Sequence, residues 1–221
     1  MNAELDHIFV CCAVGAPEAS LLVERGLLEG SANTHSGQGT ANRRFFFSNA
    51  YLELLWVSDP AEAQQENVLP TQLWERWSRR TEGACPFGIV FRPRTTSTAE
   101  APFPSWSYRP PYLPNGLSIE VGRSMALTEP QLFYLPFARH RDPTGREPTA
   151  HPAGIDRISN VSVTIPPGLE PSDTLASALD ADLFTLRRGP DYLLELAFDG
   201  EGYSSIDLRP GLPLLFVPTA R

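Results

Sequence analysis

The clearest hydrophobic pattern in the chain is a pair of largely apolar runs, Arg43–Phe47 and Tyr51–Val57, joined by the short polar link at residues 48–50. Two such runs with a short link predict a β-hairpin. In the second run, alternate residues are apolar on both faces, so this strand should be covered on both sides. Glu53 breaks the pattern, because an unpaired buried carboxylate is costly. It must therefore meet water, a hydrogen-bond donor, a basic residue or a metal.

The rest of the pattern predicts more strands than helices. Helices are expected where Leu21, Leu22 and Val23 follow a Pro-Glu start, at Leu73–Trp77, and around Leu175–Leu179, with a polar loop at residues 29–39. The proline-rich stretch from Pro93 to Pro114 fits edge segments and surface loop rather than central strands. Strands are expected at Leu5–Cys12, Phe87–Phe91, Leu117–Gly122, Gln131–Phe137, Ile158–Ile165, Phe184–Arg188, Tyr192–Phe198, Ser204–Leu208 and residues 213–217.

The order of strand, helix and strands recurs at both ends of the chain, and residues 87–137 form a helix-poor version between them. This recurrence predicts an internally repeated α+β architecture.

Composition and charge narrow the class of protein. The 221 residues are 42% hydrophobic and 20% charged, which is typical of a folded protein, and the formal net charge of −8 argues against a general nucleic-acid binder. All 18 positive charges are arginines, a bias that fits a GC-rich bacterium. We find neither a membrane-length apolar run nor an export leader, and therefore expect a soluble, cytoplasmic protein. Cys11, Cys12 and Cys85 are expected to be buried, reduced thiols.

Three segments together resemble a known family. They are Leu5-Asp6-His7-Ile8, the loop from His35 to Asn42 (HSGQGTAN), and Tyr51-Leu52-Glu53-Leu54. In this order and spacing they resemble the glyoxalase-like members of the vicinal oxygen chelate (VOC) superfamily, which includes the bleomycin-resistance proteins and extradiol dioxygenases. The segment His151-Pro152-Ala153-Gly154 is similar to a second signature of glyoxalase-like proteins.

The resemblance implies an α+β fold of repeated βαβββ modules whose mixed, curved sheets enclose a cleft. It divides the chain into residues 1–83 (first module and connecting helix), 84–150 (helix-poor middle strands and linker) and 151–221 (a last βαβββ-like module), all within one compact domain.

The resemblance also implies a metal site. In metal-dependent members, a His on the first strand and a Glu on the last strand of each module bind one divalent ion, and His7 and Glu53 match this pair. Imidazole plus carboxylate suits Zn, Ni, Fe, Co or Mn. Glu53 is also the candidate general base. The alternatives are a core histidine at position 7 and, for Glu53, an ion pair with Arg43 or Arg44 on the paired strand.

Two modules with one such pair each would give a quartet of ligands. The module that supplies the second pair can be assigned in two ways. If the last module pairs with the first, Asn160 takes the place of His7 and Asp207 that of Glu53. If the middle segment does so, the equivalents are apolar and lie near Phe87, Gly88 and Tyr134. Either way the set of ligands is incomplete.

Further candidates for ligand contacts are His35, Thr40 and Asn42, with the backbone N–H groups of the glycine loop, at the mouth of the cleft, and His151. Alternatively, this loop is simply a turn in which Asn42 caps its own backbone, and His151 is solvated.

Three functions stay open. The first is a metal-dependent lyase, isomerase or dioxygenase acting on a small, partly apolar molecule. The second is a metal-free protein of the same fold that binds or sequesters such a molecule. The third is an interaction protein that docks partners through residues 93–114. The chain is expected to bind neither nucleic acid nor membrane, and a homodimer is expected by analogy with relatives.

Overall fold

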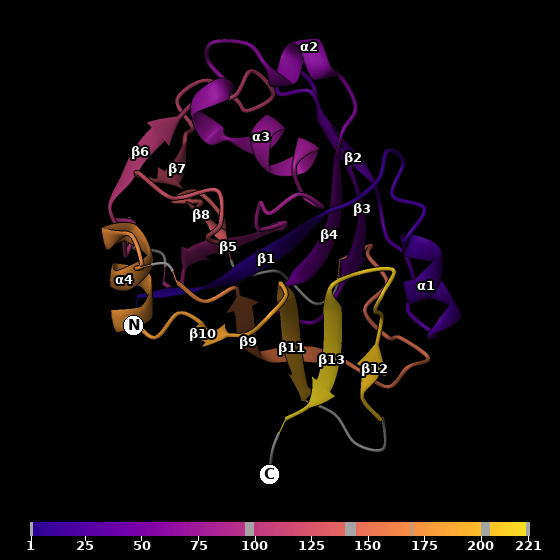
Figure 1. Ribbon diagram of the computed structural model, residues 1–221. Helices are drawn as coiled ribbons and strands as arrows, with labels where there is room; N and C mark the ends of the chain where they lie inside the picture. The colour runs from indigo at the N-terminus through magenta and orange to yellow at the C-terminus, as the bar shows by residue number, and fades with distance from the viewer. Residues whose placement is uncertain (1, 96–99, 140–144, 169, 200–203, 220–221) are drawn as a thin grey trace.

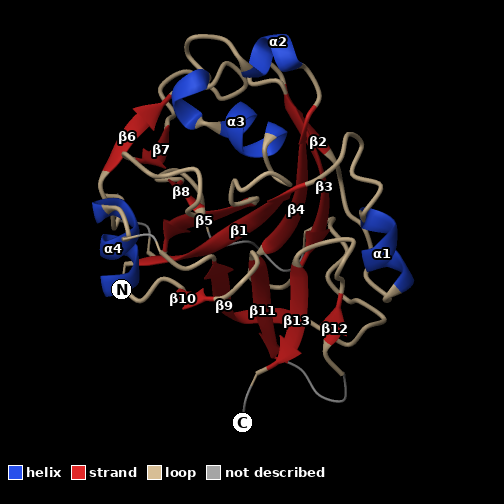
Figure 2. Cartoon of the chain, in the orientation of Figure 1, coloured by secondary structure: helices blue, strands red, loops and turns tan. Residues whose placement is uncertain are grey.

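The computed structural model describes residues 2–95, 100–139, 145–168, 170–199 and 204–219. In these ranges two β-sheets are stacked, with short helices around them (Figures 1 and 2). None of the helices found there is long and apolar enough to cross a membrane.

The larger sheet has eight strands in the order β2-β3-β4-β1-β5-β8-β7-β6. Its curvature brings the β2–β3 end and the β6–β7 end to opposite sides of α3 (Figure 1). The strands are β1 (Ala3–Cys11), β2 (Asn33–His35), β3 (Thr40–Phe46), β4 (Tyr51–Val57), β5 (Phe87–Pro93), β6 (Ser105–Tyr108), β7 (Ile119–Gly122) and β8 (Gln131–Tyr134).

The helices are short, and one of them, α3, lies between the two ends of this sheet (Figure 1). They are α1 (Ala19–Glu24), α2 (Pro60–Ala63), the 3₁₀ turn η1 (Leu69–Thr71), α3 (Leu73–Ser78) and α4 (Asp173–Asp180). The strand β2 lies in the segment expected to be a loop. Its Asn-Thr-His sequence is polar and largely exposed, so no hydrophobic alternation marks it.

Two βαβββ-like halves make up the eight-stranded sheet. In the first, β1 is parallel to β4, and β3 and β2 follow antiparallel; in the second, β5 is parallel to β8, and β7 and β6 follow in the same way. Antiparallel pairing of β1 with β5 joins the halves. The partner of the first module is therefore the middle segment, 87–134, and the quartet positions near Gly88 belong to it.

The second sheet has a different topology from the expected βαβββ module. Its order is β10-β9-β11-β13-β12, with β9 parallel to β10 and antiparallel to β11. This order matches β4-β1-β5-β8-β7 of the larger sheet, so the C-terminal segment is a reduced copy of both modules rather than of one. The strands are β9 (Arg157–Ile165), β10 (Thr185–Arg188), β11 (Leu193–Asp199), β12 (Ile206–Asp207) and β13 (Leu214–Pro218).

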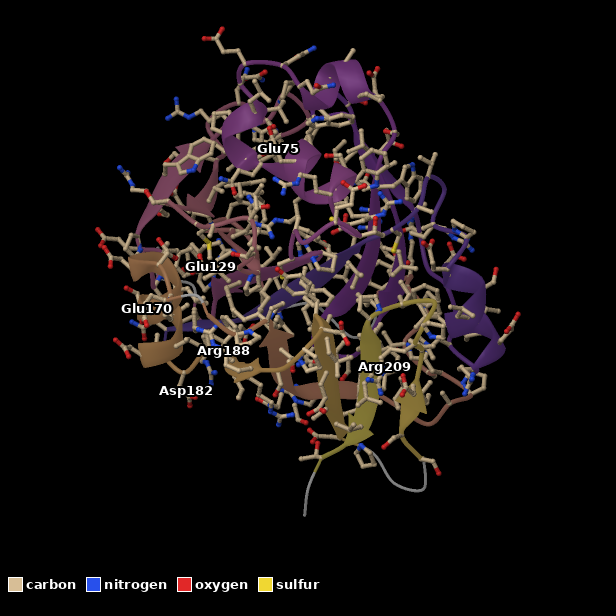
Figure 3. The ribbon with its side chains drawn as sticks, in the orientation of Figure 1. Glu75, Glu129, Glu170, Asp182, Arg188 and Arg209 are labelled. Carbon is tan, nitrogen blue, oxygen red and sulfur yellow. The ribbon has the colours of Figure 1, made fainter. Side chains whose placement is uncertain are left out.

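The helix α4 packs on the second module, which has no helix of its own between β5 and β6 in the described residues. The Thr174 hydroxyl donates to the carbonyls of Arg123 (2.6 Å) and Pro104 (3.2 Å). Glu129, labelled beside α4 in Figure 3, accepts the Ser172 N–H at 2.7 Å. The C-terminal segment thus supplies the helix that the middle segment lacks.

Two hydrophobic clusters lie on opposite faces of the large sheet. The larger one fills the space between the two sheets and includes Ile8, Leu52, Leu54, Phe198 and Phe216. The smaller one lines the concave face and is built around Phe9, Leu55, Val90 and Phe133. The prediction that Tyr51–Val57 is covered on both sides is confirmed, because its residues are buried or half-buried throughout.

Described parts of the proline-rich stretch pack on their own domain: Phe103 and Tyr108 are buried, and β6 forms the edge of the sheet. This packing removes the reason for treating 93–114 as a free docking surface. The three cysteines are free and buried, as predicted.

Candidate functional site

A cavity of about 210 Å³ opens on the concave face of the large sheet. Its walls are mostly apolar and aromatic, and its polar groups come mainly from the first module. The lining residues are His7, Phe9, Asn33, His35, Gln38, Tyr51, Glu53, Leu55, Leu73, Val90, Tyr108, Tyr112, Leu113, Ile119, Phe133, Leu135 and Phe137.

His7 and Glu53 meet in this cavity because β1 and β4 are parallel neighbours. The register pairs His7 with Tyr51 and Phe9 with Glu53, which puts the two polar side chains on the same face. His7 Nε2 lies 3.4 Å from Glu53 Oε2. The His7 ring stacks on Tyr51 at 4.3 Å between centroids, which fixes its plane.

The other ring nitrogen of His7 is held by Asp6. The β1–β5 register shifts between Leu5 and His7, so Asp6 is an extra residue in a β-bulge. Asp6 Oδ1 lies 2.6 Å from His7 Nδ1, and Asp6 Oδ2 lies 3.1 Å from Nη1 of the buried Arg92. Since a carboxylate only accepts, His7 Nδ1 carries the proton and Nε2 faces Glu53.

Glu53 is 3% exposed and is bound by Asn42 rather than by an arginine. Asn42 Oδ1 accepts the backbone N–H of Asn33 at 2.8 Å, so its amide nitrogen is turned toward Glu53 Oε1, 2.5 Å away. Arg43 pairs instead with Glu29, and Arg44 donates to Ser31. Glu53 is therefore bound by a neutral donor, the Asn42 amide, and the alternative of an ion pair with Arg43 or Arg44 does not hold.

His35 and Thr40 lie beside this pair. His35 Nδ1 is 2.9 Å from the Thr40 hydroxyl, which also accepts from Gln38 Nε2 at 2.8 Å. Burial lowers the pKa of His35, opposed by the charge of Glu53. Tyr112 packs on the His35 ring at 4.9 Å between centroids and also lines the cavity.

The backbone N–H groups of the glycine loop are already occupied. The N–H groups of Gly37 and Gly39 donate to Glu62 Oε2 at 2.6 and 3.1 Å. Gly39 has a φ of +73°, and a Cβ there would lie 2.3 Å from the Asp59 carbonyl. The loop is thus tied to α2, and these two donors are not offered to a ligand.

Five predicted ligand residues are not among those that line the cavity. Thr40 and Asn42 bond to the lining residues His35 and Glu53, and the other three lie elsewhere. His151 is buried near β3, where Nδ1 accepts the Leu28 N–H at 3.0 Å and Nε2 bonds to the Phe46 carbonyl at 2.8 Å. Asn160 is exposed on β9. Asp207 is exposed on β12, the edge of the other sheet, and pairs with Arg209, which Figure 3 labels there. Asp207 does not take the place of Glu53 in the last module, because its strand β12 does not pair with β9 as β4 pairs with β1.

A larger cavity of about 330 Å³ lies between the two sheets and is lined in part by Arg92 and Asn160. The Arg92 guanidinium is already paired with Glu4 and Asp6. The candidate functional site is therefore the concave cavity, which His7 and Glu53 line.

The second module offers apolar groups where metal ligands would be needed. Gly88 and Phe133 occupy the places that correspond to His7 and Glu53. The Phe9 ring covers Gly88, since a Cβ on Gly88 would lie 2.1 Å from it, and this ring also contacts Phe133 at 5.9 Å. Within the described residues, no group of three or more His, Cys, Asp or Glu side chains could hold a metal. The donor set does not fit a metal quartet.

Comparison with known proteins agrees with this architecture. The sequence profile of the "Glyoxalase-like domain" family matches residues 5–179. The chain belongs to this family. The match ends within α4, so it covers both modules of the large sheet and the helix packed on the second. The predicted glyoxalase-like (VOC-type) fold is thereby confirmed. A search of curated proteins gave no match.

Solved structures align with the chain at low sequence identity. A hypothetical protein from Staphylococcus aureus aligns with a TM-score of 0.51 and 12% identity, over 98% of this chain and 99% of that one. A xylose isomerase-like TIM barrel/4-hydroxyphenylpyruvate dioxygenase fusion protein aligns with a TM-score of 0.49 and 11% identity, over 91% of this chain and 37% of that one. A mutant 4-hydroxymandelate synthase from Streptomyces coelicolor gives 0.43 and 13%, over 97% and 62%.

The polar residues of this glyoxalase-like site that the sequence did not predict include Asp6, Gln38, Tyr108 and Tyr112. Asp6 stands inside the quoted motif next to His7, and that adjacency was the available signal. The two tyrosines lie in the proline-rich stretch, whose strand content is too low for a pattern to predict which way they face.

Proposed function

We propose that this glyoxalase-like protein binds a small, partly apolar molecule in the concave cavity without a protein-held metal, and that His7 and Glu53 form the polar end of the site. The observation that carries the proposal is the asymmetry of the cavity. One imidazole–carboxylate pair, in which the carboxylate is buried, faces walls that are apolar at the corresponding positions of the second module.

The size of the cavity sets the size of the molecule. An engineered protein cavity of about 150 Å³ holds benzene. At about 210 Å³ this cavity suits a single ring with a short substituent. Apolar walls with a few convergent polar groups are the usual composition of small-molecule sites.

Metal analysis and a ligand screen test the proposal together. Protein purified without chelators should hold far less than one divalent ion per chain, and EDTA, Zn, Ni, Co, Fe or Mn should leave its melting temperature unchanged. Single-ring compounds should raise that temperature, and Glu53→Gln should change which compounds do so. As a matched control, Glu120→Gln removes a carboxylate on the same sheet that bonds Ser105 and Ser107 outside the cavity.

The presence of bound metal would contradict this proposal. If the wild type holds nearly one divalent ion per chain and Glu53→Ala holds none, with both proteins folded, the metal-free proposal is refuted and the metal-dependent hypothesis is favoured.

A second candidate is a proton-transfer enzyme, and the chain of contacts Asp6–His7–Glu53 favours it. Asp6 fixes the tautomer of His7, and His7 can exchange a proton with Glu53, the arrangement that general acid–base catalysis uses. A bound ketone would then exchange the hydrogens next to its carbonyl with D₂O. NMR should detect that exchange in the wild type, whereas Glu53→Gln should abolish it and Glu120→Gln should not.

The expectations of a cytoplasmic location and a homodimer are kept as part of this proposal. Three buried, free thiols support a reducing compartment. The dimer rests on analogy alone, and light scattering of the purified protein would test it.

A further inference from the structure

His35 lies on the same face of the large sheet as Glu53. It ends β2, and the register pairs it with Thr40 of β3, which in turn pairs with Val57 of β4. Residues paired across strands point to the same face, and so do alternate residues along a strand, so the His35 side chain shares the concave face with Glu53. Both residues line the concave cavity. Which of its two ring nitrogens carries the proton decides what His35 offers a ligand.

One nitrogen of His35 ends a chain of hydrogen bonds whose direction begins at Tyr112. Burial raises the pKa of Tyr112, so its hydroxyl is protonated at neutral pH and donates to Gln38 Oε1 at 3.4 Å. The other end of that amide, Nε2, donates to the Thr40 hydroxyl oxygen at 2.8 Å. Since the amide nitrogen of glutamine only donates, Thr40 is an acceptor in this contact.

The Thr40 hydroxyl fixes the tautomer of His35. Thr40 is 1% exposed, and the partners of its hydroxyl among the described residues are Gln38 Nε2 and, at 2.9 Å, His35 Nδ1. Because the contact with Gln38 is already filled by a donor, the hydroxyl proton goes to His35 Nδ1, which accepts it. Burial lowers the pKa of His35, opposed by the charge of Glu53, and this favours the neutral ring. A neutral His35 whose Nδ1 accepts carries its proton on Nε2.

The Nε2 atom of His35 is open to the cavity. It forms no hydrogen bond with the described residues. Polar side-chain atoms that are both fully covered and unpartnered occur in five described residues, and His35 is not one of them. The Nε2–H group therefore keeps accessible surface on a residue that lines the cavity.

The two histidines of the cavity thus present opposite hydrogen-bonding groups. His7 donates from Nδ1 to Asp6 and turns Nε2 toward Glu53, whereas His35 presents a donor. A negatively charged ligand atom would be repelled by the Glu53 carboxylate and would lose its hydration. A carbonyl oxygen is neutral, accepts the His35 N–H and brings no donor that would need a partner of its own.

We propose that His35 is a specificity-determining residue whose Nε2–H binds the carbonyl oxygen of the ligand, so that the cavity selects a neutral, single-ring ketone or aldehyde over an isostere without the oxygen. This assignment rests on the proposed function, since it names the class of ligand that the same cavity takes. The donor is held in place by its contacts with Thr40 and Tyr112.

The tautomer of His35 can be measured without a ligand. Long-range ¹H–¹⁵N correlation spectra of the labelled protein distinguish a protonated ring nitrogen from a bare one, and His35→Gln identifies the signals by their loss. At pH 7 the His35 ring should show a protonated Nε2 and a bare Nδ1. A protonated Nδ1 with a bare Nε2 would overturn the assignment.

The binding test compares acetophenone with α-methylstyrene, in which a CH₂ group replaces the carbonyl oxygen. Ligand-observed NMR titration gives both dissociation constants for the wild type, His35→Asn, His35→Gln and His151→Gln. The amide of asparagine lies near the position of Nδ1 and that of glutamine near the position of Nε2. His35→Asn therefore keeps a partner for Thr40 and loses the cavity donor, whereas His35→Gln keeps a donor toward the cavity.

His35→Asn should weaken acetophenone binding by about three- to tenfold, since the lost interaction is one neutral hydrogen bond. Its affinity for α-methylstyrene should equal that of the wild type. His35→Gln should recover part of the lost acetophenone affinity. His151→Gln is the matched control: His151 is also buried, but it bonds the backbone with both nitrogens and does not line the cavity, so neither constant should change.

Two failures can be told apart. If acetophenone binds the wild type but His35→Asn weakens both probes equally or neither, or His35→Gln binds acetophenone no better than His35→Asn, the assignment of His35 is overturned and the proposed function stands. If neither probe binds the wild type, the proposed single-ring ligand is refuted and this assignment with it. Melting temperatures show whether each variant folds, and if His35→Asn does not, the tautomer of the wild type and the comparison of His35→Gln with the wild type decide.

Discussion

Replacing Asn42 by alanine should destabilise the protein through Glu53. The variant removes the donor that lies 2.5 Å from the Glu53 carboxylate and also the acceptor of the Asn33 N–H. A hydrogen bond to a charged group contributes about 1.5–3 kcal/mol and a neutral one about 0.5–1.5 kcal/mol. The expected loss in unfolding free energy at pH 7 is therefore about 2–4 kcal/mol.

A double-mutant cycle separates the two contributions. In the Glu53→Gln background the acceptor is neutral, so Asn42→Ala should cost about 1 kcal/mol less than in the wild type. Urea unfolding measures each free energy, and the melting temperature should move by about 2–4 °C per kcal/mol for a chain of this size.

Asn49 is the matched control. It is also a buried asparagine, but it bonds the Ile158 backbone with both ends of its amide, outside the concave cavity. Its replacement by alanine should cost the same in both backgrounds, within the additivity expected of separate sites. A coupling energy between Asn42 and Glu53 that is no larger than the Asn49 value would refute the idea that Asn42 stabilises the buried charge.

Two further predictions concern packing and pH. Gly88→Ala should cost about 1–3 kcal/mol because the new Cβ meets the Phe9 ring, and the cost in urea unfolding should shrink in the Phe9→Leu background; an equal cost in both would exclude the ring as the obstacle. Burial lowers the pKa of His151 in the folded protein. Below about pH 6.5 the unfolded chain therefore binds more protons than the folded one, and the free energy of unfolding decreases as the pH is lowered. This acid loss should be smaller in His151→Gln, whose amide can keep both bonds, and a pH dependence equal to that of the wild type would contradict the assignment.

Local pattern singled out Glu53, because a carboxylate stands out in an apolar strand. His7 was matched to it through the family resemblance, and the parallel pairing of β1 with β4 brings the two side chains together. The covering of β4 on both sides followed from alternation alone. These are properties of single strands, which a period of two reveals.

The partner of the first module could not be chosen from the sequence. The apolar equivalents at Gly88 and Phe133 carry no polar signal. Asn160 and Asp207 were matched to His7 and Glu53 only through the similar strand pattern of the last module. Pairing between strands distant in the chain depends on how whole sheets pack, and the strand pattern of the two candidate segments is alike. Asn42 likewise gained its role from a cross-strand contact that no local motif specifies.

The helix α4 has a consequence for how this chain is made. The second module, residues 87–134, leaves the ribosome well before residues 173–180, yet Thr174 and Leu175 of that helix pack against it. Until then an apolar surface of the nascent chain stays bare, and exposed surface of this kind promotes aggregation during synthesis. In a chain cut at residue 150, α4 would be missing and this apolar surface would stay exposed.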